Sequence, residues 1–381
     1  MKVLMISSDR NILTPNSAVS ARMKEYAGLV EELHIVLLSD SSHGLKEAQI
    51  GKSVWVYPTN SSIKFLRPMD AARIGKRIVF EKNFVRGRSV ITADSFECGW
   101  AAMKVKAKWR IPFELQIHTD PFSPYFSGFQ NSVRKFFARN ILAKADSIRV
   151  VSENLKRSIE NLLEIENWKL KINVLPIYVD RQNIESAPIT FDAHARYGWS
   201  FVLLSVARLE PEKNLSLALE TLALVRKQFP DTGLVIVGSG SEEGRLRGLV
   251  GELNLEGFVE FAGWQEALGS YYKTANIFLQ TSHFEGYGLA LVEAGLSGLP
   301  VVTTPVGLAL ELENGKDAYI CADGDAGAFA GAIVDLIEHN LKRENLKLNL
   351  KQTLEGKLIA KDEYLERMKK GWEECASRVG Q

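Results

Sequence analysis

Residues 277–294 read IFLQTSHFEGYGLALVEA, and this stretch combines the signals of a strand, a tight turn and a helix. The apolar run at 277–280 predicts a short buried strand. Gly286 and Gly288 allow the backbone to turn tightly, and we expect a helix to begin near Gly288. Strand, loop and helix in this order form the repeating unit of parallel α/β proteins, so the stretch favours that fold class.

The same alternation of strand and helix signals extends outward through most of the chain. In the second half we expect strands at 201–206, 234–237, 259–261, 277–280 and 300–303, and helices at 215–229 and 358–377. In the first half we expect strands at 3–7, 33–38, 54–57, 90–92, 113–117, 148–151 and 172–175, and a helix within 18–33. The pattern predicts an α/β protein of two doubly wound parallel-sheet domains that face a ligand-binding cleft.

A break in this rhythm separates the two series of strands. Residues 176–199 contain Pro188 and Gly198 and show little periodicity, which indicates a linker. We therefore predict an amino-terminal domain over 1–185 and a carboxyl-terminal domain over 186–357, followed by a helical segment over 358–381.

Composition places the chain among ordinary globular proteins. Its 381 residues are 46% hydrophobic and 24% charged, which excludes a wholly disordered or collagenous chain. The apolar run at 1–6 is too short for a signal peptide, so we expect a cytoplasmic protein. Cys98, Cys321 and Cys375 lie far apart and predict neither a disulfide framework nor a zinc site.

The near-neutral net charge conceals an asymmetry between the two halves. Residues 1–190 carry 28 Lys and Arg against 19 Asp and Glu, whereas the remainder carries 19 against 27. Basic and apolar residues alternate within 63–88, which is typical of segments that bind anionic membrane surfaces. The alternative is a set of solvated helix faces whose apolar residues belong to the core. Because the second half is acidic and no nucleic-acid motif is present, we expect no nucleic-acid partner.

Two glutamates flank the expected start of the helix near Gly288. Glu285 falls in the loop and Glu293 in the early turns of the helix. Free N–H groups at a helix start bind anions, and carboxylates nearby can accept hydrogen bonds from ligand hydroxyls. The alternative is that these acids only complement the helix dipole.

Two cations follow the strand expected at 201–206. Arg208 can hold a phosphate through two parallel hydrogen bonds, and Lys213 adds a point charge. Together they are suited to neutralising a diphosphate. The alternative is a pair of surface salt bridges to Glu210 and Glu212.

The arrangement of Arg208 and Lys213, followed by Glu285 and Glu293, resembles retaining nucleotide-sugar glycosyltransferases of the GT-B type with two Rossmann-like domains, specifically glycosyltransferase family 4. This resemblance implies that Arg208 and Lys213 hold the donor diphosphate and that Glu293 binds the ribose. It implies that Glu285 contacts the donor sugar and that the last helix crosses back to the first domain. Further donor-binding residues implied by it are Gly286, Tyr287, Gly288, Leu289, Gly263 and Trp264.

The first domain contributes its own candidates. His118, after the strand at 113–117, resembles the family histidine that faces the donor sugar; the alternatives are a metal ligand or a histidine with a local partner. On the acceptor side we expect Ser17, Asp120, Phe122 and Tyr125, the last two in the loop 122–126. Two features depart from the family pattern. Residues 14–18 contain no glycine where many members have a glycine-rich loop, and Ala207 precedes Arg208 where glycine is common.

The resemblance implies transfer of a sugar from a nucleotide-diphosphate sugar to a hydroxyl, with retention, in cell-surface or lipid-linked glycan assembly. The sugar nucleotide is a co-substrate, and we expect no cofactor and no metal. The segment 323–325 reads Asp-Gly-Asp, which we interpret as a turn and helix cap rather than a metal site. We expect the protein in the cytoplasm, peripheral on the inner face of the membrane. The alternatives are a nucleotide-sugar epimerase or phosphorylase on the same fold, or a non-catalytic nucleotide-sugar-binding module.

Overall fold

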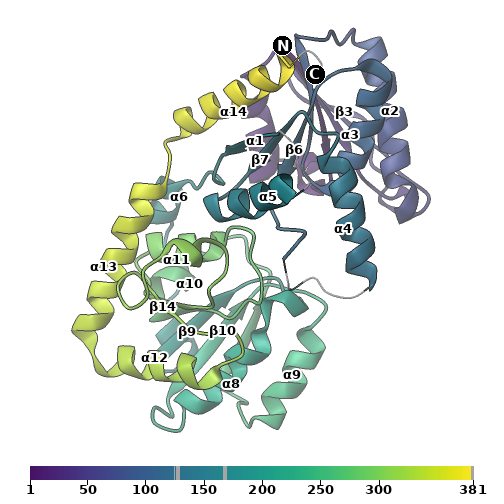
Figure 1. Ribbon diagram of the computed structural model, residues 1–381. Helices are drawn as coiled ribbons and strands as arrows, with labels where there is room; N and C mark the ends of the chain where they lie inside the picture. Colours follow the sequence, from purple (N-terminus) through teal and green to yellow (C-terminus); the bar gives the residue numbers. More distant parts are fainter. Residues whose placement is uncertain (124, 126–128, 166–169, 379–381) are drawn as a thin grey trace. The chain divides into compact units, whose positions relative to one another are not determined.

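The computed structural model describes residues 1–123, 125, 129–165 and 170–378. The chain forms two compact units (Figure 1). Unit 1 comprises Met1–Pro176 and Ala360–Gln381, and unit 2 comprises Ile177–Ile359. Each unit is built on a parallel sheet that is covered by helices.

The sheet of unit 1 has the strand order β3-β4-β2-β1-β5-β6-β7-β8. Its strands are β1 (Lys2–Ser7), β2 (Glu32–Leu37), β3 (Ala48–Gly51), β4 (Val54–Pro58), β5 (Ser89–Ala93), β6 (Phe113–Ile117), β7 (Ser147–Val150) and β8 (Lys171–Val174). Each neighbouring pair is parallel except β3 and β4, which form an antiparallel edge. Strand β3 was not predicted, because its four residues alternate weakly and contain a glycine.

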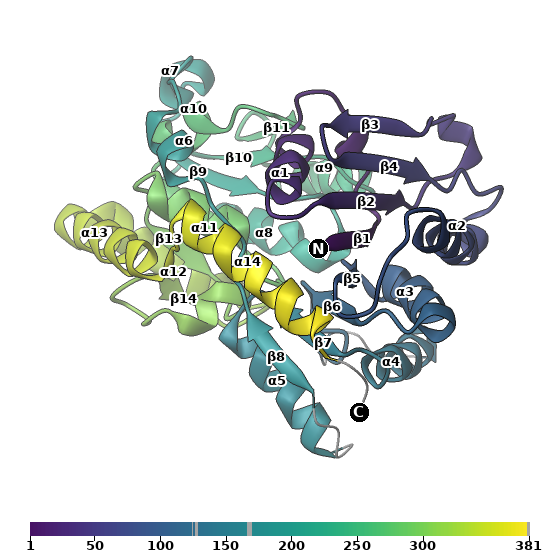
Figure 2. The same cartoon turned by 90° about the horizontal axis from the view of Figure 1, so that it is seen from above.

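Helices cover both faces of this sheet (Figure 2). They are α1 (Ala18–Ala27), α2 (Arg67–Glu81), α3 (Phe96–Trp109), α4 (Phe129–Leu142), α5 (Glu153–Ile165) and α14 (Lys361–Ala376), with 3-10 turns η1 (Arg10–Leu13), η2 (Ser41–His43) and η3 (Lys64–Leu66). Helices α2, α3 and α4 lie on one face, and α1 and α14 lie on the other. Gly75 permits a close approach of α2 to α3, since a Cβ atom there would lie 2.9 Å from Cγ2 of Val105.

The last helix is an integral part of unit 1. The hydroxyl groups of Tyr26 and Tyr364 lie 2.7 Å apart in a buried hydrogen bond. Trp372 is fully buried and packs edge-on against Tyr26. Helix α14 is therefore attached to α1 through its aromatic core face.

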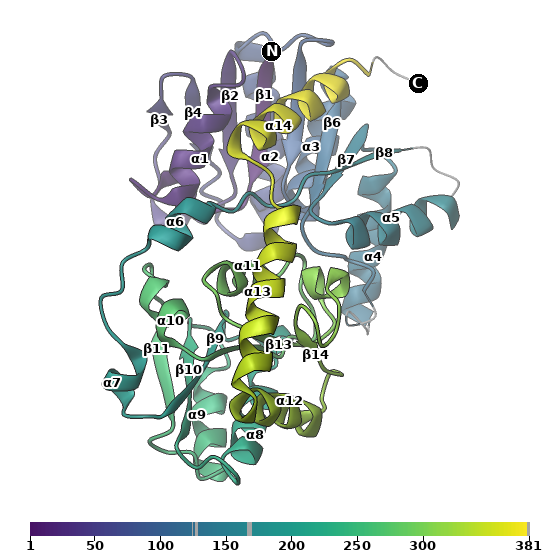
Figure 3. The same ribbon diagram turned by 90° about the vertical axis from the view of Figure 1, so that its left-hand side faces the viewer.

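The sheet of unit 2 is parallel throughout and has the order β11-β10-β9-β12-β13-β14. Its strands are β9 (Phe201–Val206), β10 (Thr232–Val237), β11 (Val259–Gly263), β12 (Ile277–Gln280), β13 (Val301–Thr303) and β14 (Tyr319–Ile320). Its helices are α6 (Arg181–Ser186), α7 (Ala193–Tyr197), α8 (Leu215–Val225), α9 (Glu243–Glu252), α10 (Gly269–Thr274), α11 (Leu289–Leu296), α12 (Ala326–Glu338) and α13 (Asn340–Lys357), with 3-10 turns η4 (Pro211–Lys213) and η5 (Gly307–Glu311). Gly295 of α11 packs directly on Leu350 and Leu354 of α13 (Figure 3).

The predicted α/β class, with two Rossmann-like parallel-sheet units, is confirmed. The boundaries differ from the predicted 185 and 357, since the chain divides after Pro176 and after Ile359. The stretch predicted as a linker carries α6 and α7 instead. Ion pairs of Arg181 with Glu355, at 2.9 Å, and of Lys351 with Glu185, at 2.9 Å, attach α6 to α13. Among the described residues, no helix is both long and apolar enough to cross a bilayer.

Candidate functional site

The candidate site in unit 2 is built from loops that follow neighbouring strands of the sheet. In a parallel sheet all strands end at one edge, which is where ligands bind in such folds. Strand β9 leads into the loop that carries Arg208 and Lys213, and its neighbour β12 leads into the loop that carries Glu285. The sheet order therefore brings together residues that lie more than seventy positions apart in the sequence.

Lys213 and Glu285 form an ion pair at this edge. The Lys213 ammonium lies 2.8 Å from each carboxylate oxygen of Glu285, and each side chain is only 14% exposed. The Ser282 hydroxyl donates a further hydrogen bond of 2.7 Å to Oε1 of Glu285. The carboxylate is thus held by the Lys213 ammonium and by the Ser282 hydroxyl.

Hydrogen bonds between the loops hold this pair in place. The Thr281 hydroxyl donates to the carbonyl of Lys213 at 3.2 Å, and the backbone N–H of His283 donates to the carbonyl of Glu212 at 2.9 Å. The Thr304 hydroxyl, after β13, donates to the carbonyl of Ser282 at 2.6 Å. Loops after β9, β12 and β13 therefore form one connected scaffold.

Gly307 packs against the loop 281–288 that carries Glu285, which we call the glutamate loop, and this role was not predicted from the sequence. Its φ of 56° lies in the left-handed region, and a Cβ atom there would lie 2.7 Å from the carbonyl oxygen of Tyr287. The N–H of Leu308 donates to that same carbonyl at 2.7 Å. The local signal was a glycine in the loop that follows the strand expected at 300–303, two residues after Pro305, where turns are common.

Glu293 lies in α11, which begins after Gly288 at a φ of 90°. The Tyr272 hydroxyl donates a hydrogen bond of 2.9 Å to Oε2 of Glu293. Burial raises the pKa of Glu293 above its ordinary value, and the hydrogen bond from Tyr272 partly opposes this. Burial also raises the pKa of Tyr272 far above its usual range, which keeps the phenol protonated as a donor. Tyr272, from α10, was not foreseen as a partner.

The other residues of the turn play different parts. The Tyr287 side chain is buried, and burial raises its pKa to about 12. Because the ring is buried, this residue can contact a ligand only through its backbone. Leu289, at the first position of α11, is exposed. Gly286 gives the turn between Glu285 and Tyr287 a position without a side chain.

Arg208 lies at the surface and is 64% exposed. Its guanidinium is 2.8 Å from Oε1 of Glu212, so the alternative ion pair with Glu212 is present in this structure. Glu210 instead accepts hydrogen bonds from Ser241, and these lower the pKa of Glu210. An exposed pair of this kind contributes little to stability, and the guanidinium is free to exchange its partner for a stronger anion.

The glycines of the 238–240 turn bring two loops together. A Cβ atom at Gly238 would lie 1.9 Å from the carbonyl oxygen of Ala207, and one at Gly240 would lie 2.3 Å from that of Leu209. The turn after β10 therefore packs directly on the loop that carries Arg208. Gly238 and Gly240 thus have a packing role, because a side chain at either position would collide with the backbone of the Arg208 loop.

Strand β11, which lies beyond β10 in the sheet, ends at Gly263, and Trp264 follows it. The carbonyl of Gly263 accepts a hydrogen bond of 2.8 Å from the N–H of Gly238. Trp264 is exposed, so a large aromatic surface is available at the same edge of the sheet.

Unit 1 carries the remaining candidates at the ends of its own strands. His118 follows β6 and is exposed. Desolvation by the surrounding protein, and then the positive charges of Arg149 and Arg22, lower the pKa of His118 to about 4. The residue nevertheless keeps an exposed surface. The ring is thus neutral at neutral pH.

Two of the acceptor-side candidates serve the local structure. Ser17 caps α1 by accepting from the N–H of Ser20. Asp120 accepts from the N–H of Phe122 at 2.8 Å and from the hydroxyl of Ser158 at 2.5 Å. Phe122 lies under the guanidinium of Arg139, and Tyr125 is partly exposed. Residues 124 and 126 of this loop lie outside the described residues.

Asp323 and Asp325 occupy a turn, as predicted. Asp325 caps α12 by accepting from the N–H of Ala328 at 2.8 Å, and Asp323 lies 2.6 Å from the ring of His283. In the part of the chain that the structure describes, no group of three or more His, Cys, Asp or Glu residues is placed to hold a metal ion.

Comparison with known proteins gives a family match over the part of the chain that contains this site. Residues 187–353 match the family model described as glycosyl transferases group 1. The chain is 24% identical over 353 residues to alpha-monoglucosyldiacylglycerol synthase of Acholeplasma laidlawii, covering 82% of this chain and 86% of that protein. It is 31% identical over 183 residues to the GtfA subunit of a peptide N-acetylglucosaminyltransferase of Streptococcus pneumoniae, covering 46% of this chain and 36% of that protein.

The fold is also found among solved structures. The crystal structure of HepE of Anabaena with UDP and glucose matches with a TM-score of 0.76 and 19% identity, covering 100% of both chains. Several other curated relatives are matched over less than two thirds of their own length. The matched segment contains Lys213, Glu285 and Glu293, so residues 187–353 are similar to the glycosyl transferases group 1 family, and the chain as a whole has the two-unit fold of these solved glycosyltransferase structures.

Proposed function

We propose that this protein transfers a sugar from a nucleotide-diphosphate sugar to a hydroxyl acceptor, with retention at the anomeric carbon. The observation that carries the proposal is the ion pair of Lys213 with Glu285 at the carboxyl edge of the unit 2 sheet. A cation and a carboxylate held side by side suit a ligand that has both a diphosphate and sugar hydroxyls. The family match of residues 187–353 supports the same conclusion.

The donor diphosphate binds to Lys213, Arg208 and the free N–H groups at the start of α11 in this proposal. The incoming phosphate gives Lys213 a second anionic partner, while Glu285 continues to fix its position. Arg208 exchanges its exposed contact with Glu212 for the phosphate. These positive groups stabilise the charge that develops on the departing diphosphate, which is the largest protein contribution to such a step.

The nucleoside and sugar are held by the remaining polar groups. Glu293 accepts hydrogen bonds from the ribose hydroxyls, and Tyr272 holds its carboxylate in one orientation. The backbone at 286–289 lies along the donor, and Gly263 and Trp264 supply the surface for the nucleoside. Glu285 accepts hydrogen bonds from hydroxyls of the transferred sugar. We retain His118 as a proposed sugar-contacting residue, because its neutral ring can both donate and accept a hydrogen bond.

The reaction balances without a cofactor. The bond between the anomeric carbon and the diphosphate oxygen breaks with both electrons leaving on the oxygen, and the carbon passes through an oxocarbenium-like state. The acceptor oxygen then forms its bond on the same face of the sugar, and its proton passes to a phosphate oxygen of the donor. This route needs neither a protein base nor a metal ion.

The acceptor is a glycan or a lipid-linked glycan of cell-surface assembly in this proposal, with the enzyme on the cytoplasmic face of the membrane. The relative from Acholeplasma laidlawii is named as a synthase of a glucosylated diacylglycerol, which supports a lipid-linked acceptor. The basic character of residues 1–190 supports the same location.

Thermal melting with a panel of sugar nucleotides tests the donor proposal. A sugar linked to UDP, GDP, ADP or dTDP that binds the folded chain raises the melting temperature, and Glu293→Gln removes that shift. Product analysis then identifies the reaction, since transfer requires an acceptor, epimerisation requires none, and phosphorolysis consumes phosphate. Absence of any shift across the panel would contradict the proposal.

A further inference from the structure

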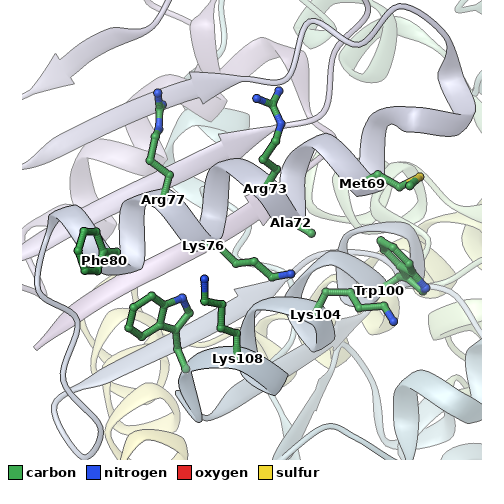
Figure 4. Close-up of a pocket in the computed structure, with 10 residues that line it drawn as sticks. Met69, Ala72, Arg73, Lys76, Arg77, Phe80, Trp100, Lys104 and Lys108 are labelled. Carbon is green, nitrogen blue, oxygen red and sulfur yellow. The ribbon is translucent and has the colours of Figure 1, made fainter.

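A basic and aromatic groove lies between α2 and α3 of unit 1 (Figure 4). It has a volume of about 680 Å³. Its lining comes from one face of each helix and consists of Met69, Ala72, Arg73, Lys76, Arg77, Phe80, Trp100, Lys104, Lys108 and Trp109. Five of these residues are cationic, and none of the described residues in the lining is acidic.

Three lysines provide positive charge that no carboxylate of the described residues neutralises. Lys76 points from α2 toward α3, and Lys108 points from α3 toward α2 (Figure 4). The amines of Lys104 and Lys108 lie over the rings of Trp100 and Trp109, at 5.1 and 5.3 Å from the ring centres. By contrast, Arg73 and Arg77 are paired with Asp70 and Glu47. The lysines thus carry the positive charge of the groove that no ion pair with a described carboxylate offsets.

Large apolar side chains surround this groove and remain exposed. Phe65, from η3, is 82% exposed, Phe80 is 68% exposed and Phe136, from α4, is 64% exposed. Met69 and Phe137 are also exposed. Ile78, on the opposite side of α2, is buried in the core. The alternative that the apolar residues of 63–88 all belong to the core therefore applies to only part of them.

Trp100 connects the groove to two further hollows on the same surface. It also lines a hollow of about 630 Å³ with Phe65 and Phe137, and one of about 570 Å³ with Phe136 and Lys144. Basic, aromatic and aliphatic side chains, together with the carboxylate of Glu97, thus form one continuous surface over α2, α3 and α4. We call it the α2–α4 surface.

We infer that the α2–α4 surface binds an anionic membrane, with a lipid phosphate seated between Lys76, Lys104 and Lys108. Cationic side chains attract the headgroups, while exposed aromatic and aliphatic side chains enter the interfacial region. Tryptophan suits this depth because its ring is apolar and its N–H is polar. A soluble polyanion would neutralise the lysines but leave Phe65, Phe80 and Phe136 in water, so a lipid surface explains the whole set.

The purpose of this membrane contact rests on the proposed function, since a lipid-linked acceptor lies at such a surface. The contact itself requires neither donor nor acceptor. Vesicle binding can therefore fail while sugar-nucleotide binding succeeds, and the reverse also holds.

Co-sedimentation of the full-length protein with vesicles tests the inference. We expect binding to vesicles of phosphatidylglycerol and phosphatidylcholine, and much weaker binding to vesicles of phosphatidylcholine alone. Lys76→Ala with Lys108→Ala should weaken the partition by about 30-fold, given roughly 1 kcal/mol for each basic residue at the surface. Phe65→Ser with Phe136→Ser should weaken it at high salt, where electrostatic attraction is screened.

A matched control uses two exposed lysines elsewhere, Lys52→Ala with Lys227→Ala, which remove the same charge. This control should bind vesicles with nearly the affinity of the unaltered protein. Equal loss in the control and in the groove variant would show a general charge effect and overturn the inference. Circular dichroism and the melting temperature confirm that each variant is folded.

Two competition experiments separate the other possible ligands. Inorganic phosphate at about 10 mM, which would occupy most of a site with a Kd of about 1 mM, should leave vesicle binding intact. Loss of vesicle binding would indicate a site for free phosphate. Dextran sulfate should release the protein only at low salt. Tight binding of dextran sulfate that depends on the lysines but not on Phe65 and Phe136 would identify a polyanion as the ligand and contradict the membrane assignment.

Discussion

The ammonium of Lys213 lies 2.8 Å from both carboxylate oxygens of Glu285, and this pair joins the loops that follow β9 and β12. Each side chain is largely shielded from water. In a shielded ion pair, the attraction between the charges roughly offsets the free-energy cost of removing them from water. The pair is therefore tolerated only while both partners are present. Removing one partner leaves a shielded, uncompensated charge.

Lys213→Met should therefore lower the free energy of unfolding by about 3 kcal/mol, because the Glu285 carboxylate loses its counter-ion. The double variant Lys213→Met with Glu285→Gln should recover most of this stability and remain inactive in sugar transfer. Urea denaturation of the two single variants and the double variant measures the coupling energy. Additive effects would show that the two charges do not interact in solution.

Arg208→Ala should separate activity from stability. The side chain is 64% exposed and its pair with Glu212 contributes little, so the melting temperature should stay close to that of the unaltered protein. The rate of transfer should fall about a hundredfold, or roughly 3 kcal/mol, because one diphosphate contact is lost.

Arg247→Ala is the matched control for this variant. Arg247 is 55% exposed and forms a comparable 2.8 Å pair with Glu243, four residues away. It should leave the rate of transfer unchanged. Near-normal turnover of Arg208→Ala would rule out a role for Arg208 in holding the donor.

Much of the fold was predictable because parallel strands read as continuous apolar runs. Strands β6, β9 and β12 were placed at their observed bounds, and the other predicted strands differed by only one or two residues at one or both ends. Strand β3 was missed because a short edge strand lacks such a run. Helix α6 was missed because its position depends on ion pairs with α13, far away in the sequence.

The candidate site shows the same division. Arg208, Lys213, Glu285 and Glu293 stand in loops or helix starts directly after strands, so their placement at one sheet edge followed from the sequence. Their partners did not, because the contact of Tyr272 with Glu293 arises only when α10 packs against α11. Local spacing contains no information on such tertiary contacts.

Chelation should leave sugar transfer unchanged. The diphosphate is neutralised by Lys213, Arg208 and backbone N–H groups in the proposed mechanism, so no divalent cation is required. Activity should be the same in EDTA as in Mg²⁺ or Mn²⁺. Loss of activity in EDTA that Mg²⁺ or Mn²⁺ restores would show that a cation takes part.

Gly307→Ala should destabilise the glutamate loop by more than the cost of placing alanine at a left-handed backbone angle. The new methyl group would lie 2.7 Å from the carbonyl oxygen of Tyr287 and 2.9 Å from Cβ of Glu285. Gly315 provides the control, since its φ of 77° is also left-handed but nothing lies within 4 Å of an added Cβ atom. Gly315→Ala should cost about 1 kcal/mol of stability, and Gly307→Ala about 2–3 kcal/mol together with most donor binding. Equal effects of the two substitutions, measured by thermal melting and by the donor-induced shift, would show that the close approach at Gly307 is relieved without consequence.

Glu293→Gln should change how stability depends on pH. Burial raises the folded-state pKa of Glu293 above the ordinary value of 4.5, which the unfolded chain retains. Between these two values the folded state holds more protons than the unfolded state, so the free energy of unfolding falls as the pH rises through this window. The stabilising contribution is full below the unfolded pKa and is lost above the folded one.

The amide introduced by Glu293→Gln does not titrate, so that part of the decline should disappear. The substitution should also make the protein at pH 7 as stable as before or slightly more stable, because a shielded carboxylate no longer has to be ionised. Donor binding should nevertheless be lost, since the amide offers the ribose hydroxyls a weaker and uncharged acceptor. Melting temperatures of both proteins from pH 4 to pH 7, with and without the donor, test the two effects together. A variant that keeps both the original pH profile and the donor-induced shift would show that Glu293 serves only the packing of α11 against Tyr272.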